Sequence, residues 1–197
     1  MQSLYYFIVK PLEERYDNIR RVDDTDLIIN TSIENHRVIS KKAVVVSTPA
    51  AYTTKVNIGD EVYVHHNVFR RWYDQKDRER NSSTYFKDDL YFVIPEQIYM
   101  YNLKPHLDYC FIKPLKNQSV LENRKEQPNV GIVKYANKFL EALGITPETL
   151  ITFTPDSEFE FIIKGERLYC MKSNDIALTH EYQGNEEENN PSWAKSS

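Results

Sequence analysis

The sequence contains one apolar heptapeptide twice: Tyr6-Phe7-Ile8-Val9-Lys10-Pro11-Leu12 and, 103 residues later, Tyr109-Cys110-Phe111-Ile112-Lys113-Pro114-Leu115. Tyr, Lys, Pro and Leu return at matching positions, and the other three positions stay apolar or small. A repeat of this kind indicates the architecture of a chain more directly than a single motif does, because both copies are expected to form the same supersecondary unit.

Other segments repeat in the same order. Leu90-Tyr91-Phe92-Val93 corresponds to Leu168-Tyr169-Cys170-Met171 at an offset of 78 residues. Two valine-rich runs correspond between these matches, Ala43–Val46 with Val130–Val133 and Val62–Val64 with Leu150–Phe153. The shared order predicts a tandem duplication with copies at residues 1–103 and 104–182.

The composition of each copy predicts β-structure. Short apolar runs alternate with Gly, Pro, Asn and Asp, and the chain has 14 Tyr but only 5 Gly. This pattern is typical of a small all-β barrel or sandwich. We therefore expect an all-β fold of two small barrels with one short helix in the second, at Lys138–Leu143, where Phe139, Leu140 and Leu143 share a face and Gly144 ends the helix.

Length, charge and cysteine content exclude several classes of protein. The chain has 197 residues, a net charge of -4 and two cysteines, which argues against a disulfide scaffold and makes nucleic-acid binding unlikely. No apolar run approaches the roughly 18–20 residues of a membrane helix, and Met1–Lys10 lacks a secretory signal pattern. We expect a cytoplasmic protein with a disordered acidic tail at residues 183–197.

The order of elements resembles the GroES-like co-chaperonins, the small lids of chaperonin cages. The segments that carry the resemblance are Ile8–Leu12, Val56–Val62, Gly131–Val133, Gly165–Met171 and Asn174–Leu178. They cover an opening strand that ends in Lys-Pro-Leu, a valine-rich strand, a Gly-Asp turn into a strand, a Gly-Glu hairpin and a closing Asp-Ile-Ala-Leu run. The resemblance implies a chaperonin ring as partner, assembly of this chain into a homo-oligomeric ring, and no cofactor. Divergence, duplication and low glycine content would suit a phage origin.

The resemblance also implies a docking site in the loop after the first strand, at about residues 13–41. This loop is polar except for Leu27, Ile28 and Ile29, which we call the docking triplet. The corresponding loop of co-chaperonins is mobile and docks an apolar tripeptide on the chaperonin. The alternative is an ordinary edge strand packed on its own barrel. The second copy offers only Val120-Leu121 in a shorter loop, so we expect one working loop per chain.

A second candidate surface does not match the family. It comprises His65, His66, Arg70, Arg71, Trp72 and Tyr73, in a stretch that runs to a charged segment at residues 74–80. Arginine interleaved with aromatic residues can bind a partner; the alternative is a strand end and a solvated loop with Phe69 and Trp72 partly in the core. Consecutive histidines on a strand point to opposite faces, which argues against a shared metal.

Two further predictions concern chemistry. Cys110 and Cys170 match Phe7 and Phe92 of the first copy, and we expect them to meet across one core as reduced thiols. We expect no enzyme, because the sequence has no phosphate-binding loop, nucleophile elbow or His-Glu-x-x-His motif, and Glu158, Glu160 and Glu166 fit solvated positions. The sequence thus predicts a co-chaperonin, or alternatively a structural or decoration protein of a particle that uses the same fold.

Overall fold

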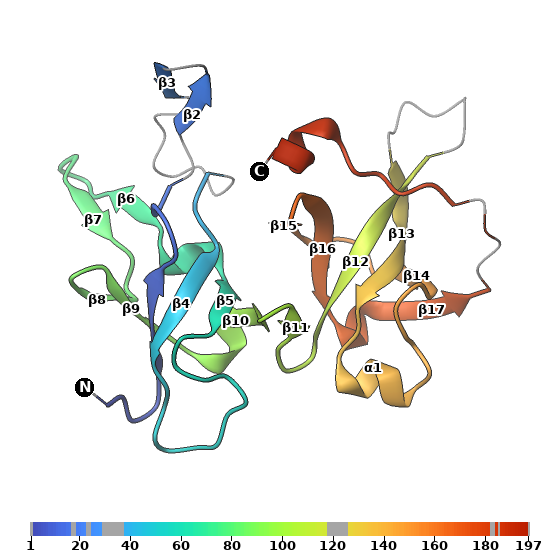
Figure 1. The fold of residues 1–197 in the computed structure, drawn as a ribbon, viewed down its shortest axis with the longest axis horizontal. Coiled ribbons are helices and arrows are strands. Elements are labelled where there is room, and N and C mark those ends of the chain that lie inside the picture. Colours follow the sequence, from blue (N-terminus) through green and yellow to red (C-terminus); the bar gives the residue numbers. More distant parts are fainter. Residues whose placement is uncertain are drawn as a thin grey trace. The chain divides into compact units, whose positions relative to one another are not determined.

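The computed structural model describes residues 2–16, 19–22, 25–28, 38–117, 126–181, 184 and 186–196, with backbone alone for 19–22, 25–28 and 196. The chain divides into two compact units, Met1–Asn102 and Leu103–Ser197, drawn in blue to green and in green to red in Figure 1. The sequence repeat had predicted this boundary one residue later, after Leu103. No helix among the described residues is long and apolar enough to cross a membrane.

The strands of the first unit form an antiparallel sheet with the order β10-β5-β4-β1-β9-β8. Two small hairpins, β2–β3 and β6–β7, extend from this sheet's connections. The strands are β1 (Phe7–Pro11), β2 (Ile19–Val22), β3 (Thr25–Ile28), β4 (Lys42–Ser47), β5 (Glu61–Val64), β6 (Arg71–Tyr73), β7 (Glu79–Asn81), β8 (Tyr85–Lys87), β9 (Leu90–Val93) and β10 (Ile98–Tyr101), with short 3-10 turns η1 (His66–Val68) and η2 (Pro95–Gln97). The two-residue strand β11 (Lys104–Pro105) lies after the boundary, in the second unit.

The second unit is built on an antiparallel sheet with the order β15-β16-β12-β13-β14-β17. Its elements are β12 (Tyr109–Lys116), β13 (Glu126–Tyr135), α1 (Lys138–Ala142), β14 (Leu150–Phe153), β15 (Phe159–Ile163), β16 (Glu166–Lys172), η3 (Ser173–Asp175), β17 (Ile176–His180) and η4 (Ser192–Ser196). When β1, β4, β5, β8, β9 and β10 are matched to β12, β13, β14, β15, β16 and β17, the two sheets have the same strand order.

The two sheets also share their register. Val9 lies opposite Tyr91 in the first unit, and Ile112 lies opposite Tyr169 in the second, as offsets of 103 and 78 residues require. The pairing of the opening strand with β4 or β13 is irregular at one matching step, after Ile8 and after Phe111. One register prediction was wrong by a residue: Ala43 matches Gly131, because Pro11 faces Ala43 while Pro114 faces Gly131.

The all-β prediction is confirmed in outline, but the described strands do not form closed barrels. The outermost described strands of each unit, β10 and β8 in the first and β15 and β17 in the second, do not pair with each other. The short helix is present, and Gly144 follows it with a φ of +80°, a left-handed conformation that favours glycine. Its predicted apolar face was wrong, because only Leu140 is buried, while Phe139 and Leu143 are each 61% exposed.

The two cysteines also differ from expectation. Both are buried, but Cys110 lies opposite Met171 and Cys170 lies opposite Phe111. Consecutive residues of a strand alternate faces, so the two thiols lie on opposite sides of the sheet. Cys110 packs with Ile112, Val133 and Met171, and burial raises the pKa of its thiol to about 12. The two thiols therefore do not meet in one core.

The described residues of the acidic tail lie against the second unit, in contrast to the predicted disorder. Lys116 N donates to Glu187 O at 2.8 Å, and Asn189 N donates to Pro114 O at 2.8 Å. The Asn190 side chain accepts from Arg167 N and donates to Gly165 O, and Ala194 is fully buried. Main-chain hydrogen bonds and the burial of Ala194 hold this segment in place. The prediction of disorder had considered only its charge pattern.

Candidate functional site

The structure describes two of the three residues of the docking triplet. Leu27 and Ile28 belong to β3, which pairs with β2 so that Leu27 lies opposite Arg20 and Ile28 opposite Ile19. Ile29 lies outside the described residues. The sequence places the triplet in a polar loop between the first strand and the valine-rich strand, and the β2–β3 hairpin occupies that connection between β1 and β4.

The second candidate surface lies in residues 65–84, which join β5 to β8. We call this segment the first-unit insertion, because the matching connection in the second unit, from β14 to β15, is only residues 154–158. Of its six predicted residues, His65 and His66 lie at the start of the insertion, Arg71, Trp72 and Tyr73 form β6, and Arg70 precedes β6.

The histidine pair corrects the expected opposite orientation. Strand β5 ends at Val64, so His65 and His66 do not alternate faces; their rings stack with centroids 4.3 Å apart. His65 Nδ1 accepts a hydrogen bond from Asn67 N at 3.0 Å. Burial, and next the charge of Lys41, lower the pKa of His65. Among the described residues, no group of three or more His, Cys, Asp or Glu is placed to hold a metal ion.

The middle of the first-unit insertion is part of the core. Val68 and Phe69 are fully buried, and the Phe69 ring packs edge-on against Tyr91 with centroids 4.8 Å apart. Arg15 Nη2 donates to Phe69 O at 3.0 Å, and the hydroxyls of Ser82 and Thr84 donate to Val68 O. These contacts attach the insertion to the first unit.

The hairpin β6–β7 presents the aromatic residues. Trp72 and Tyr73 are 42% and 50% exposed, and Trp72 Nε1 donates to Asn81 O at 3.2 Å. Arg71 is used internally, since its guanidinium lies 4.5 Å from the Tyr16 ring and Nη1 donates to Glu79 at 2.9 Å. Arg70 is half-buried. The hairpin therefore offers two aromatic side chains rather than a row of free arginines.

The turn of this hairpin is organised by Asp74. Its carboxylate accepts hydrogen bonds from the backbone N–H groups of Lys76 and Arg78 and from the side chains of Arg78 and Arg80. The backbone bond from Arg78 is the largest cause that lowers the pKa of Asp74 to about 2. The charged segment after Tyr73 is thus an ordered turn whose arginines are paired.

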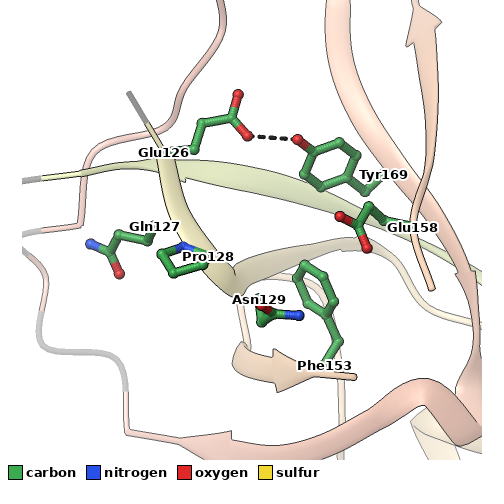
Figure 2. Close-up of a pocket in the computed structure, with 7 residues that line it drawn as sticks. All are labelled: Glu126, Gln127, Pro128, Asn129, Phe153, Glu158 and Tyr169. Atoms are coloured by element: carbon green, nitrogen blue, oxygen red, sulfur yellow. Dashed lines mark hydrogen bonds between the residues drawn. The ribbon is translucent and has the colours of Figure 1, made fainter. Parts of the chain in front are cut away.

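A pocket of about 330 Å³ in the second unit was not predicted. It is lined by Glu126, Gln127, Pro128, Asn129, Phe153, Glu158 and Tyr169, and we call it the second-unit pocket. Figure 2 shows Gln127 and Pro128 on one side and Phe153, Glu158 and Tyr169 on the other. Asn129 has a φ of +60°, a left-handed conformation that asparagine tolerates better than most residues.

The sequence had indicated solvated positions for the acidic residues near this pocket. The structure instead pairs Glu160 and Glu166 with basic side chains. Glu160 accepts from Arg167 Nε at 2.7 Å, and Glu166 pairs with Lys134 at 2.9 Å. Glu126 contacts both Arg167 and the Tyr169 hydroxyl. Burial raises the pKa of Tyr169, and the hydrogen bond to Glu126 adds to this. The equivalence of Tyr91 and Tyr169 was a partial signal for this site in the sequence, but it did not indicate a pocket.

Comparison with known proteins adds no relative: no protein-family model matches this chain, and no similar chain is found among curated proteins.

Proposed function

We propose that this protein is a co-chaperonin of GroES-like type, which caps a chaperonin ring and assists protein folding in the cytoplasm. The observation that carries the proposal is the repeated strand order and register of the two units. It agrees with the order of elements on which the resemblance depends, and the connection from β1 to β4 carries the docking triplet.

The energetics of docking favour a multivalent lid. Burial of three aliphatic side chains supplies about 5–9 kcal/mol, and ordering about ten loop residues at about 1 kcal/mol each offsets most of it. One chain should therefore bind weakly. A homo-oligomeric ring presents several triplets at high effective concentration, so that it binds tightly and still responds to a change of state in its partner.

The test is co-sedimentation with a chaperonin ring and ATP. Wild type should pellet with the chaperonin, and Ile28→Asp should stay in the supernatant because a charge cannot enter an apolar groove. The matched control is Ile58→Asp: Ile58 is an isoleucine of the same unit and is 67% exposed, so this variant should pellet like wild type. Equal pelleting of Ile28→Asp and wild type contradicts the docking site.

A second candidate function is a structural or decoration protein of a particle. It is favoured by one observation, the exposure of Trp72 and Tyr73 on a hairpin that the second unit lacks. In that case Trp72→Ala with Tyr73→Ala would abolish particle assembly. Ile28→Asp would leave assembly intact, and no chaperonin complex would form.

A further inference from the structure

The second-unit pocket corresponds to a space that the first unit fills. Tyr91 and Tyr169 hold matching register positions, and so do Val64 and Phe153, which lie opposite Ile98 and Ile176. In the first unit Val64 and Tyr91 share a core cluster with Phe69. Among the described residues, the second unit has none at the position of Phe69, because residues 154–158 replace the first-unit insertion. The Phe153 ring lies beside Tyr169, with centroids 6.4 Å apart. The fold therefore accommodates an aromatic ring beside this tyrosine.

The pocket is also lined by Glu158, one of whose carboxylate oxygens has no donor in the described part of the chain. The Oε2 atom of Glu158 is buried and has no hydrogen-bond partner among the described residues. Figure 2 places this carboxylate between the rings of Tyr169 and Phe153. A carboxylate partly removed from water is costly unless a donor, best a cationic one, meets it.

The other acid of the pocket is already satisfied. Glu126 Oε1 accepts from Arg167 Nη1 and from Asn189 Nδ2, and Glu126 Oε2 accepts from the Tyr169 hydroxyl at 2.6 Å. Arg167 in turn is shared with Glu160. Glu158 is thus the carboxylate that remains for a ligand, and the lining favours a positive charge.

Size and apolar lining define the rest of the ligand. A volume of about 330 Å³ is at the small end of the range for ligand sites. Pro128 and the rings of Phe153 and Tyr169 supply apolar surface, on which an aromatic body and an ammonium group both pack favourably. We propose that the second-unit pocket binds a primary amine attached to an aromatic ring, with the ammonium on Glu158 and the ring in the space that Phe69 fills in the first unit.

Titration of the full-length protein with phenethylamine tests this proposal, with amide NMR shifts and calorimetry as readouts. Shifts should centre on Asn129, Phe153 and Tyr169. Phenylacetate, which has a similar ring but a negative charge, should not bind. Shifts centred elsewhere, no phenethylamine binding, or equal binding of phenylacetate would overturn the proposal.

Two glutamate variants isolate the ion pair. Glu158→Gln keeps the shape of the side chain and should weaken phenethylamine binding about ten-fold or more, as expected for loss of a charge-assisted hydrogen bond. Glu141→Gln, at an exposed position on α1 of the same unit, should bind like wild type. Equal affinity of Glu158→Gln and wild type refutes the role of Glu158, and unchanged amide spectra outside the pocket show that the variant is folded.

The amine has two sources, a free small molecule or the N-terminal residue of a protein chain. The peptide Phe-Gly-Gly and its N-acetylated form separate them. Tighter binding of the free-amine peptide than of phenethylamine assigns the site to a protein terminus, and the reverse order assigns it to a small amine; either supports the proposal. Binding of the acetylated peptide as tightly as the free one overturns it.

Discussion

Tyr91 and Tyr169 occupy one position in two copies of the same sheet, but their surroundings differ. Tyr91 is fully buried against Phe69, which the first-unit insertion supplies. Tyr169 borders an open pocket and bonds to Glu126. Both tyrosines still lie beneath an arginine, Arg15 at 5.2 Å and Arg167 at 4.9 Å from the ring centre.

The comparison shows which parts of the two units differ: the connections between strands, and not the sheet itself. The opening strand pairs with the strand of each tyrosine in the same register in both copies, so the sheet sets where each tyrosine lies. What covers the tyrosine comes from the connections between strands, which are less constrained by main-chain pairing. Three predictions use this contrast, and the largest expected effect comes first.

Removal of the covering ring should make the first unit resemble the second. Phe69→Ala should lower the free energy of unfolding of the first unit by about 3–5 kcal/mol, because it leaves a cavity beside Tyr91. Denaturant titration in a Trp193→Phe background measures this, since Trp72 then reports on the first unit alone. Phe86→Ala, at a ring of the same unit that is 39% exposed, serves as control and should cost clearly less stability. A loss below about 1 kcal/mol for Phe69→Ala would show that Phe69 does not fill this space.

The second prediction exchanges a small residue between the units. A Cβ at Gly131 would lie 2.5 Å from Ile112 Cγ2 and 2.7 Å from Lys113 O, although the matching residue is Ala43. Gly131→Ala should therefore destabilise the second unit by about 1–3 kcal/mol through overpacking. Denaturation followed through Trp193 in a Trp72→Phe background measures it. Ala43→Gly is the reciprocal variant, with an expected loss of about 0.5–1 kcal/mol in the first unit. If Gly131→Ala proves neutral, the two units are closer in backbone geometry than these distances indicate.

The smallest effect is a pH dependence confined to the first unit. Burial keeps the pKa of His65 below its ordinary value of 6.5, so below that pH the unfolded chain binds a proton that the folded chain resists. Stability of the first unit should therefore fall as pH drops from about 6.5 through the folded-state pKa. Denaturation midpoints at pH 7 and pH 5, followed through Trp72, measure it. His65→Gln should reduce the dependence, whereas His180→Gln, in the second unit, should leave it unchanged; a dependence that is the same in wild type and His65→Gln would contradict this origin.

The repeated segments predicted much of the fold, because strand register follows from residue offsets. Offsets of 103 and 78 residues place Val9 against Tyr91 and Ile112 against Tyr169. The same reasoning failed where a strand ended earlier than assumed. His65 lies just after β5, so strand alternation did not apply to it, while Cys110 and Cys170 lie within paired strands, where alternation separates them.

The second-unit pocket was beyond sequence reasoning for a different reason. It depends on how strands β13, β14 and β16 bring Glu126, Phe153 and Tyr169 together, and on a connection too short to cover them. In the sequence, Glu158 resembles any exposed acidic residue at the end of a strand. Only the equivalence with Tyr91 and Phe69, seen once both units are folded, marks its surroundings as an open site.

The irregular pairing step that follows Ile8 in one unit and Phe111 in the other bears on the history of the gene. A backbone irregularity at the same step of two sheets is most simply inherited from a single ancestor that already had it. The covering loop with Phe69 and the attached C-terminal segment are each described in one half only, so they are features in which the two halves differ. Shared irregularity in the sheet and divergent connections together indicate that the paired strands have changed less than the segments that join them.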